Sequence, residues 1–355
     1  MAHHRIGILL GDAIGAEIVP ATTRVIDAAL EGRDDVSREW LELPLGAAAI
    51  ESHGHHTPTS TLEGLAALQG WLMGPHDSAS YPEEFRATLN PSGVIRRHFK
   101  LYANLRPSRN LPNVPALVQD TDLIIARENT EGFYGDRSMF EGMGEVRPTE
   151  DVALATGLFT RKAIERIAHT AFRLAMTRRK RVTIVHKANV LRMTTGMFKR
   201  ICLEVAEQYP EVEVDDFHID AMAALVVRKA PHFDVIVTEN MFGDILSDLT
   251  GELVGSLGTA GGLNANDEVA MGQAAHGSAP DIAGRDLANP LGMMVSAWQL
   301  LRWLADRHGD AALAAVADDC EAGMLGALAA GHRTGDLGGG LGTAAFTEQV
   351  IAHLP

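Results

Sequence analysis

The stretch NMFGDILSDL places two aspartates, Asp244 and Asp248, four residues apart. In a helix this spacing puts both carboxylates on one face, where like charges repel each other by roughly 0.2–0.5 kcal/mol. The opposite face is apolar and is expected to be buried; it carries Ile245, Leu246, Leu249 and Leu253. The pair fits either a solvated acidic face near a helix N-terminus or two oxygen ligands of a hard divalent cation such as Mg²⁺ or Mn²⁺.

Three arginines stand where they can bind an anion. Arg96 and Arg106 both lie in the segment VIRRHFKLYANLRP, and Arg127 ends the apolar run DLIIAR. In α/β proteins ligands bind at the carboxyl ends of strands, which is where Arg127 falls. A planar guanidinium suits a carboxylate because it can bond both oxygens at once. Taken singly, each arginine is also explained by a surface ion pair in an acidic protein.

Three further side chains have types that suit proton transfer or metal binding. Lys187 ends the apolar run RVTIVHK, Tyr134 follows the strand of Arg127, and Asp220 precedes an apolar helix. A lysine at the end of a strand can act as a base or as a charge partner. Each residue also fits a structural role, because lysines are commonly solvated, tyrosines pack in cores and aspartates cap helices.

The segment HGSAPDIAG, residues 276–284, is rich in small residues and contains Asp281. Such a loop can cradle a nucleotide, with the aspartate accepting hydrogen bonds from the ribose hydroxyls, although the composition also describes an ordinary loop. The first predicted strand is followed by GDAIGAE, which offers only Gly11 and Gly15. The G-x-G-x-x-G fingerprint of a Rossmann fold is therefore absent at this position.

These residues must be positioned by strands and helices that alternate along the chain. Apolar runs are predicted to be strands, and segments with helical spacing follow them. The predicted strand and helix pairs are 5–10 with 17–31, 122–128 with 160–176, 181–187 with 196–209, and 234–240 with 244–257. This alternation predicts an α/β fold on a largely parallel sheet. Helices are predicted from Leu291 to Ala330, and a last one is predicted to begin near a capping residue, Thr343.

Charge and composition exclude several classes of protein. The 355 residues carry a formal net charge of -15 and are 46% hydrophobic, which describes a globular protein and argues against nucleic acid or an anionic membrane as a partner. No apolar run reaches the roughly 18 residues of a membrane span, and no signal peptide is recognisable. Two cysteines, Cys202 and Cys320, cannot form a disulfide framework, so we expect a reducing, cytoplasmic setting.

Taken together, these segments resemble the decarboxylating β-hydroxyacid dehydrogenases, the family of isocitrate, homoisocitrate and 3-isopropylmalate dehydrogenases. The resemblance runs nearly from end to end of the chain through GDAIGAEI, LYANLRP, RENTEGFY, HKANVL, DAMA, NMFGDILSDL, HGSAPDIAG and ANP. It implies an isopropylmalate dehydrogenase-like two-domain fold that is distinct from the Rossmann fold. Residues 1–101 and 255–355 would form a cofactor-binding domain, and residues 102–254 a central domain with metal and substrate residues and dimer contacts. The active site would be shared between the subunits of a homodimer.

The resemblance also implies roles for individual residues. Lys187 would be the general base and Tyr134 the general acid, with Lys187 and Asp220 arriving from the partner subunit. Asp220, Asp244 and Asp248 would bind Mg²⁺ or Mn²⁺. The contacts expected for a hydroxy di- or tricarboxylate are Asn90, Ser92, Arg96, Arg106 and Arg127, and those expected for NAD are His276, Gly277, Ser278, Ala279, Pro280, Asp281, Ile282 and Asn289.

The implied reaction is a metal-dependent oxidative decarboxylation of a (2R,3S)-3-substituted malate. Lys187 would take the proton of the metal-polarised C2 hydroxyl, hydride would pass to the nicotinamide, CO₂ would leave, and Tyr134 would protonate C3. Asp281 would repel the 2′-phosphate of NADP, so NAD is the expected cofactor.

The chain departs from the family's usual residues at several places, namely Ala13, Ala16, His76, Asp77, Ser78 and Gln273. Gln273 stands where a glutamate is usual, so a charge near the cofactor is missing. The segment LNPSGVIR before Arg96 decides the substrate, and its polar Asn90 and Ser92 favour a polar or anionic C3 group, as in isocitrate. The branched alkyl group of 3-isopropylmalate is the alternative. A noncatalytic regulatory subunit of the same fold is the alternative from another class, although such chains lose the lysine, tyrosine or aspartates that are present here.

Overall fold

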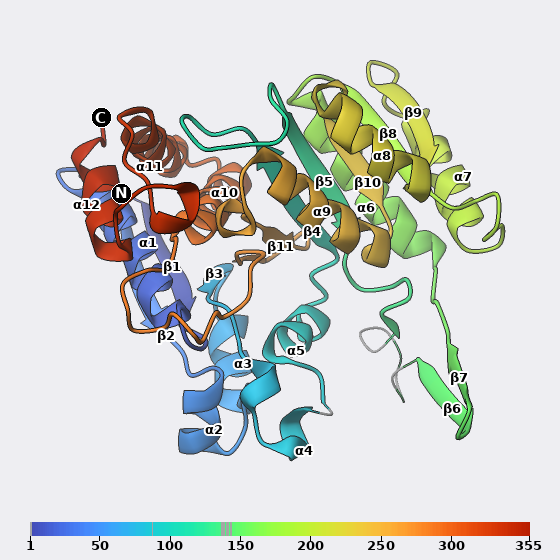
Figure 1. Ribbon diagram of the computed structural model, residues 1–355, viewed down its shortest axis with the longest axis horizontal. Coiled ribbons are helices and arrows are strands. Elements are labelled where there is room, and N and C mark those ends of the chain that lie inside the picture. Colours follow the sequence, from blue (N-terminus) through green and yellow to red (C-terminus); the bar gives the residue numbers. More distant parts are fainter. Residues whose placement is uncertain (1, 87, 136–138, 140–141, 143) are drawn as a thin grey trace. The chain divides into compact units, whose positions relative to one another are not determined.

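The computed structural model describes residues 2–86, 88–135, 139, 142 and 144–355. The chain divides into two compact units (Figure 1). Unit 1 comprises Met1–His98, Leu111–Pro115 and Gly255–Pro355, and unit 2 comprises Phe99–Asn110 and Ala116–Val254. Within the described part of the chain, no helix combines the length and the apolar character that crossing a membrane requires.

The strands of unit 1 are mostly parallel. β1 (Ala2–Leu9) pairs in parallel with β2 (Val36–Glu42) on one side and with β3 (Gly70–Met73) on the other. β12 (Ala270–Gly272) runs parallel to β3, and β11 (Leu263–Ala265) is antiparallel to β12. Every residue of β3 is buried, which is typical of a strand covered on both faces.

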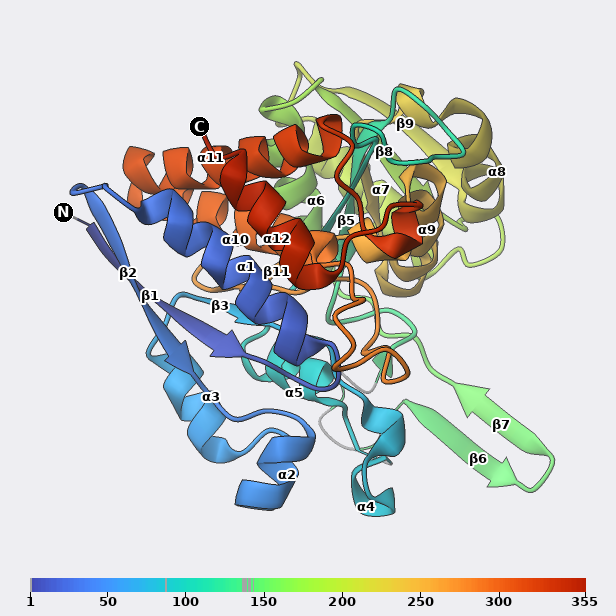
Figure 2. The same cartoon turned by 60° about the vertical axis from the view of Figure 1, so that its left-hand side comes forward.

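Four long helices of unit 1 pack against one another (Figure 2). They are α1 (Gly15–Leu30), α10 (Leu291–His308), α11 (Ala311–Ala329) and α12 (Thr343–Ala352). The shorter helices are α2 (Ala47–His53), α3 (Thr59–Ala66), α4 (Glu83–Arg86) and α5 (Pro91–His98), and 3-10 turns cover Ser78–Ser80, Leu257–Thr259 and Gly335–Leu337. The expected capping role of Thr343 is wrong, because its hydroxyl donates to the Ala288 carbonyl while the Asp286 carboxylate accepts from the backbone N–H of Ala344.

Unit 2 has a five-stranded sheet covered on both faces. β4 (Ala103–Arg109) is antiparallel to β5 (Asp122–Glu128), and β10 (Val235–Thr238), β8 (Arg181–His186) and β9 (Glu213–His218) continue the sheet in parallel. One apolar cluster packs α6 (Arg161–Met176) and α7 (Thr195–Ala206) on the sheet, and another packs α8 (Ile219–Lys229) and α9 (Asn240–Val254). A 3-10 turn, Ala230–His232, follows α8. The sheet therefore separates two cores.

A hairpin of two further strands, β6 (Glu145–Thr149) and β7 (Val152–Ala155), stands apart from the sheet of unit 2 (Figures 1 and 2). Every residue of both strands is exposed. The exposed fraction is 60% for Val146 and 57% for Leu154. The pattern of apolar residues in the sequence did not predict this hairpin.

The predicted α/β fold with a largely parallel sheet is confirmed, and each of the four predicted strand and helix pairs is present. α9 begins at Asn240, four residues before the predicted start. The predicted burial of Ile245 is wrong, because 56% of this side chain is exposed whereas Leu246 is fully buried. One position of the predicted apolar stripe therefore faces away from the core of unit 2.

Candidate active site

Arg127 is fixed at the carboxyl end of β5 by residues of helix α9. Its Nε and Nη2 donate to one oxygen, Asn240 Oδ1, at 2.9 and 2.7 Å, and its Nη1 pairs with the carboxylate of Asp244. Only 1% of Arg127 is exposed. A Cβ atom at Gly243 would lie 2.6 Å from Arg127 Cγ, so glycine at this position allows the arginine to lie against the helix.

Tyr134 joins the same contact group. Its hydroxyl donates to Asp244 Oδ2 at 3.1 Å, and the Arg127 guanidinium carbon lies 5.8 Å from the centre of its ring. The structure therefore brings together a predicted substrate-binding arginine, the predicted general acid and a predicted metal ligand. Residues 136–138, which follow this loop, lie outside the described part of the chain.

Asp248 lies one helical turn beyond Asp244 on α9. Burial raises the pKa of Asp248, and the negative charge of Asp244 raises it further, while the guanidinium of Arg106 opposes both effects. The two carboxylates are thus close enough to repel each other, as the spacing in the sequence predicts. Asp244 is partly exposed and Asp248 is exposed, so both carboxylates can be reached from solvent by a cation.

The two α9 aspartates fit a hard divalent cation as part of a larger ligand set. Both offer carboxylate oxygens, and a cation between them relieves the repulsion that raises the pKa of Asp248. Within the described residues of a single chain, no group of three or more His, Cys, Asp and Glu side chains is arranged to hold a metal ion. Mg²⁺ commonly binds through one or two carboxylates, with water and substrate supplying the other oxygens.

Lys187 and Asp220 form a second contact group, at the carboxyl end of β8 and the start of α8. The Lys187 ammonium pairs with Asp220, whose side chain is 67% exposed, and this hydrogen bond lowers the pKa of the Asp220 carboxyl. The structural alternative for Asp220, a helix cap, is wrong, because His218 is the N-cap residue and Asp220 is already helical. Its carboxylate is thus turned to Lys187 and to solvent.

In unit 1, the predicted substrate residues lie on helix α5 and meet Gln273 after strand β12. Gln273 Oε1 accepts from Ser92 Oγ at 3.1 Å and from Arg96 Nη2 at 2.9 Å. Asn90 has a structural role. Its Oδ1 accepts from the backbone N–H of Gly93 at 2.7 Å and so caps helix α5.

A single carboxylate holds the loop that follows β3. Asp12 accepts from the backbone N–H of Ala47 at 2.7 Å, from that of Asp77 at 2.8 Å and from the Tyr81 hydroxyl at 2.5 Å. A cavity of about 390 Å³ lies beside these groups. His76 in this loop is neutral at physiological pH, because burial and then the positive charge of Arg96 lower its pKa to about 4.

The segment 276–284 is a loop held on the N-terminal part of α1. The backbone N–H of Ile14 donates to the Ser278 carbonyl at 3.2 Å, and Glu17 accepts from the backbone N–H of Gly284 at 2.6 Å. Ala279 has a φ of 41°, in the left-handed region that residues with a side chain seldom adopt. The contacts to α1 thus fix a strained loop conformation.

The side chains of this loop fit a nucleotide. His276 Nε2 is buried and has no hydrogen-bond partner among the described residues, and burial lowers the pKa of this histidine. Buried polar atoms normally find a partner, so a bound cofactor is a natural one. Asp281 is exposed, and Asn289 is fixed by donating to Asp336 at 2.9 Å. The other predicted residues are half-buried (Ala279, Ile282), exposed (Gly277, Pro280) or buried (Ser278).

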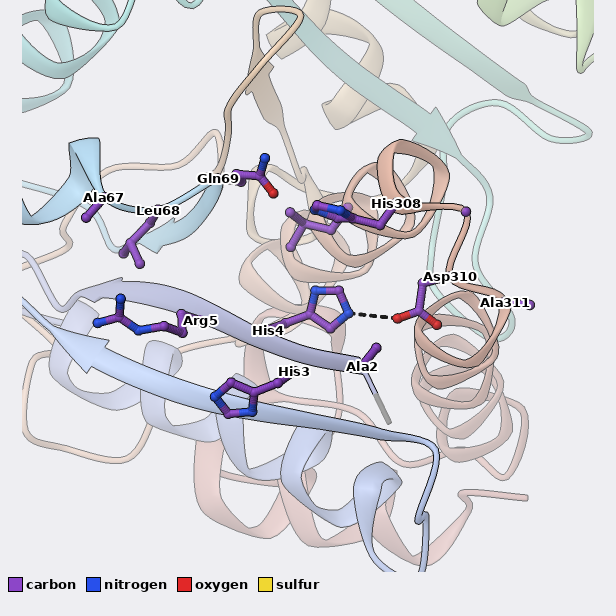
Figure 3. A pocket seen from close by; sticks show the side chains of 12 residues that line it. Ala2, His3, His4, Arg5, Ala67, Leu68, Gln69, His308, Asp310 and Ala311 are labelled. Carbon is purple, nitrogen blue, oxygen red and sulfur yellow. Dashed lines mark hydrogen bonds and ion pairs between the residues drawn. The ribbon is translucent and has the colours of Figure 1, made fainter.

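A second and larger cavity of unit 1, of about 760 Å³, contains none of the predicted site residues (Figure 3). Its polar lining includes His4, His308 and Asp310. His4 Nε2 lies 2.8 Å from Asp310 Oδ2, and Asp310 also caps α11 by accepting from the backbone N–H groups of Ala312 and Leu313. This contact ties the first strand to a helix.

Two residues of the site were missed in the sequence. Asn240 holds Arg127, and Asp12 holds the loop that carries His76. The signal for Asn240 was its position as the last residue of the predicted strand 234–240, at an edge where ligands bind. Asp12 follows the first strand, β1, after Leu10 and Gly11.

Comparisons with known proteins match the whole chain. The family model described as isocitrate/isopropylmalate dehydrogenase covers residues 5–352. The chain is 38% identical over 356 residues to a 3-isopropylmalate/3-methylmalate dehydrogenase of Methanocaldococcus jannaschii, with 99% of both chains covered. It is 39% identical over 354 residues to an isocitrate/homoisocitrate dehydrogenase of Thermus thermophilus, with 99% of this chain and 98% of the other covered. The crystal structure of isocitrate dehydrogenase from Methylococcus capsulatus matches with a TM-score of 0.86 at 34% identity, again over 99% of both chains.

Proposed function

The chain belongs to the isocitrate/isopropylmalate dehydrogenase family, and from this premise we propose that it catalyses the NAD-dependent, divalent-metal-dependent oxidative decarboxylation of a 3-substituted malate. Its named relatives are dehydrogenases. The observation that carries the proposal is the contact group of Arg127, Tyr134 and Asp244, in which a buried guanidinium, a phenol and a carboxylate meet at the end of a strand. These are the groups needed to bind an anion, donate a proton and hold a cation.

Different residues of the chain carry out different steps of the proposed reaction. Arg96, Arg106 and Arg127 bind carboxylates of the acid. Lys187, in its neutral amine form, takes the proton of the C2 hydroxyl, and Tyr134, oriented by its hydrogen bond of 3.1 Å to Asp244, delivers a proton to C3 after CO₂ has left. Asp244 and Asp248 would hold Mg²⁺ or Mn²⁺, which would supply polarisation of the C2 hydroxyl and the C1 carboxylate, and the loop 276–284 would hold NAD, which would supply the hydride acceptor.

The proposed cofactor is NAD, bound by the loop 276–284. Asp281 is exposed, so its carboxylate can accept from both ribose hydroxyls and repels a 2′-phosphate. The orphaned His276 Nε2 supports a ligand at this loop. Two buried cysteines, neither in a disulfide, support a cytoplasmic setting.

The proposed substrate has a polar or anionic C3 group, as in isocitrate. Ser92 and Arg96 present polar atoms from one face of α5 and share Gln273 as a partner. An alkyl group against this face would desolvate the Arg96 guanidinium without adding a hydrogen bond to it, which costs free energy. 3-Isopropylmalate is the second candidate, because one relative is named 3-isopropylmalate/3-methylmalate dehydrogenase.

The proposed assembly is a homodimer in which Lys187 and Asp220 serve the site of the other copy. Exposed apolar side chains support an interface on unit 2, because Ile245 and Val227 on α9 and α8 are 56% and 49% exposed. The β6–β7 hairpin adds Val146 and Leu154. Apolar surface of this kind is stabilised when a partner covers it.

Steady-state assays with Mn²⁺ and NAD test this function. The acids to compare are isocitrate, homoisocitrate, 3-isopropylmalate, malate and tartrate, with NADP in place of NAD as a second comparison. We expect the highest kcat/KM with isocitrate and NAD. A chain that binds isocitrate but turns over none of the acids would instead be a noncatalytic subunit, and a preference for 3-isopropylmalate would replace the proposed substrate.

A further inference from the structure

The side chain of Gln273 is oriented by its two partners. A guanidinium only donates hydrogen bonds, so the Gln273 atom that lies 2.9 Å from Arg96 Nη2 is the carbonyl oxygen. The same oxygen accepts from Ser92 Oγ at 3.1 Å. Ser92 and Arg96 are one helical turn apart on α5, so one amide oxygen holds both side chains on the same face of the helix.

This orientation turns the amide nitrogen away from both partners. Nε2 of Gln273 makes no hydrogen bond to any described residue, although only 7% of the side chain is exposed. An amide carries two donors on this nitrogen, and Nε2 is not one of the buried side-chain atoms that lack a partner, so it is open to solvent or to a ligand. The nearest predicted ligand of this face is the anion that Arg96 binds.

We propose that Gln273 is a substrate-binding residue that selects an anionic C3 substituent. Its Nε2 donates to a carboxylate oxygen of that substituent while its Oε1 holds Ser92 and Arg96 for the same group. This inference rests on the proposed function, because it assigns Arg96 and Ser92 to the hydroxy acid. It adds a third contact, from the residue that follows β12, to the two that α5 supplies.

The charge of residue 273 is central to this assignment. A glutamine oxygen accepts from Arg96 without contributing a formal charge, so this contact does not itself neutralise the guanidinium. A glutamate of the same shape keeps both accepted hydrogen bonds, but it has no donor and adds a negative charge beside the substrate carboxylate. The substitution Gln273→Glu therefore alters recognition while preserving the contacts to α5.

The test compares Gln273→Glu and Gln273→Met with the wild type, using isocitrate, which has a carboxylate on C3, and 3-isopropylmalate, which has an alkyl group there. We expect Gln273→Glu to raise KM for isocitrate by about 100-fold and Gln273→Met by about 10-fold, with smaller changes in kcat. The KM for 3-isopropylmalate should change less than 3-fold in Gln273→Glu, roughly the scatter of single contacts. Gln119→Glu adds the same charge at an exposed position and should leave both acids unaffected.

Two readouts separate this inference from the proposed function. Calorimetric binding of isocitrate with Mg²⁺ but without NAD reports recognition when turnover is absent, and thermal unfolding reports whether each variant is folded. A wild type that turns over neither acid overturns the proposed function, while a loss of isocitrate binding in Gln273→Glu still supports the contact. Equal losses for both acids, or a raised KM for NAD alone, would show that Gln273 serves Arg96 or the cofactor and would overturn the inference.

Discussion

Asn240 holds Arg127 through a single oxygen, which accepts from Nε at 2.9 Å and from Nη2 at 2.7 Å. Asn240 follows β10 and begins α9, whereas Arg127 lies at the end of β5. The guanidinium is 1% exposed, and a buried cation needs its donors paired. The fold itself therefore sets the direction in which Arg127 can meet a carboxylate.

Replacing Asn240 by alanine should disturb Arg127 without removing it. Two guanidinium donors lose their acceptor, which costs about 1–3 kcal/mol of stability and misplaces the group. We expect KM for the hydroxy acid to rise by about 10- to 100-fold, as measured by steady-state kinetics together with thermal unfolding. Asn240→Asp keeps the acceptor and should recover most of the stability. An unchanged KM in Asn240→Ala would show that Arg127 does not bind the substrate.

Asp248→Asn should remove one of the two α9 carboxylates. An amide binds a divalent cation less strongly than a carboxylate does, so we expect kcat to fall by about 100-fold or more at limiting Mn²⁺. The Mn²⁺ concentration for half-maximal activity should rise. Glu252→Gln, which removes a charge from an exposed position on the same helix, is the matched control. Activity of Asp248→Asn equal to that of this control would remove Asp248 from the metal site.

Mixing two inactive variants tests the shared site. Tyr134→Phe and Lys187→Met should each lose most activity alone. If each site takes Tyr134 from one copy and Lys187 from the other, mixed dimers hold one intact site of two, and a random mixture recovers about a quarter of wild-type activity. The measurement is activity after subunit exchange verified by native mass spectrometry. Exchange without recovery would contradict sharing.

Glu239 should make the stability of unit 2 depend on pH. Burial raises its pKa from 4.5 to about 7, although backbone N–H groups of Met241 and Phe242 oppose the shift. The folded state thus binds the proton more tightly than the unfolded state, so stability falls as pH rises from 4.5 to 7, by on the order of 3 kcal/mol. Glu239→Gln should abolish this fall.

Thermal unfolding at pH 5 and pH 8 measures the effect of Glu239. The difference in Tm between Glu239→Gln and wild type should move in favour of the variant at the higher pH. Glu252→Gln, an exposed carboxylate on α9, should show no such change. Parallel pH profiles for wild type and Glu239→Gln would assign the dependence to other groups.

The sequence correctly predicted those features that depend on the local pattern of apolar and polar residues. β5 ends at Glu128, next to Arg127, and β8 ends at His186, next to Lys187, because short apolar runs before polar residues define the edge of a parallel sheet. The spacing of Asp244 and Asp248 correctly indicated a shared helix face, since it depends only on helix geometry.

Features that depend on distant contacts could not be predicted. Ile245 has the hydrophobic character of a core residue, yet its burial depends on what covers that side of α9. Asn90 and Gln273 have similar side chains, but one caps a helix and the other joins two elements, which only the fold decides. The β6–β7 hairpin lacks a buried face, so it carries no apolar alternation against a core.

The Asp12 carboxylate has a consequence for how unit 1 opens. Its three donors, from Ala47, Asp77 and Tyr81, are 35, 65 and 69 residues away along the chain. Detaching any one of these segments leaves a nearly buried carboxylate short of donors, which destabilises the remaining contacts. We therefore expect the segments to open as one cooperative unit, with the amide protons of Ala47 and Asp77 exchanging with solvent at a common rate.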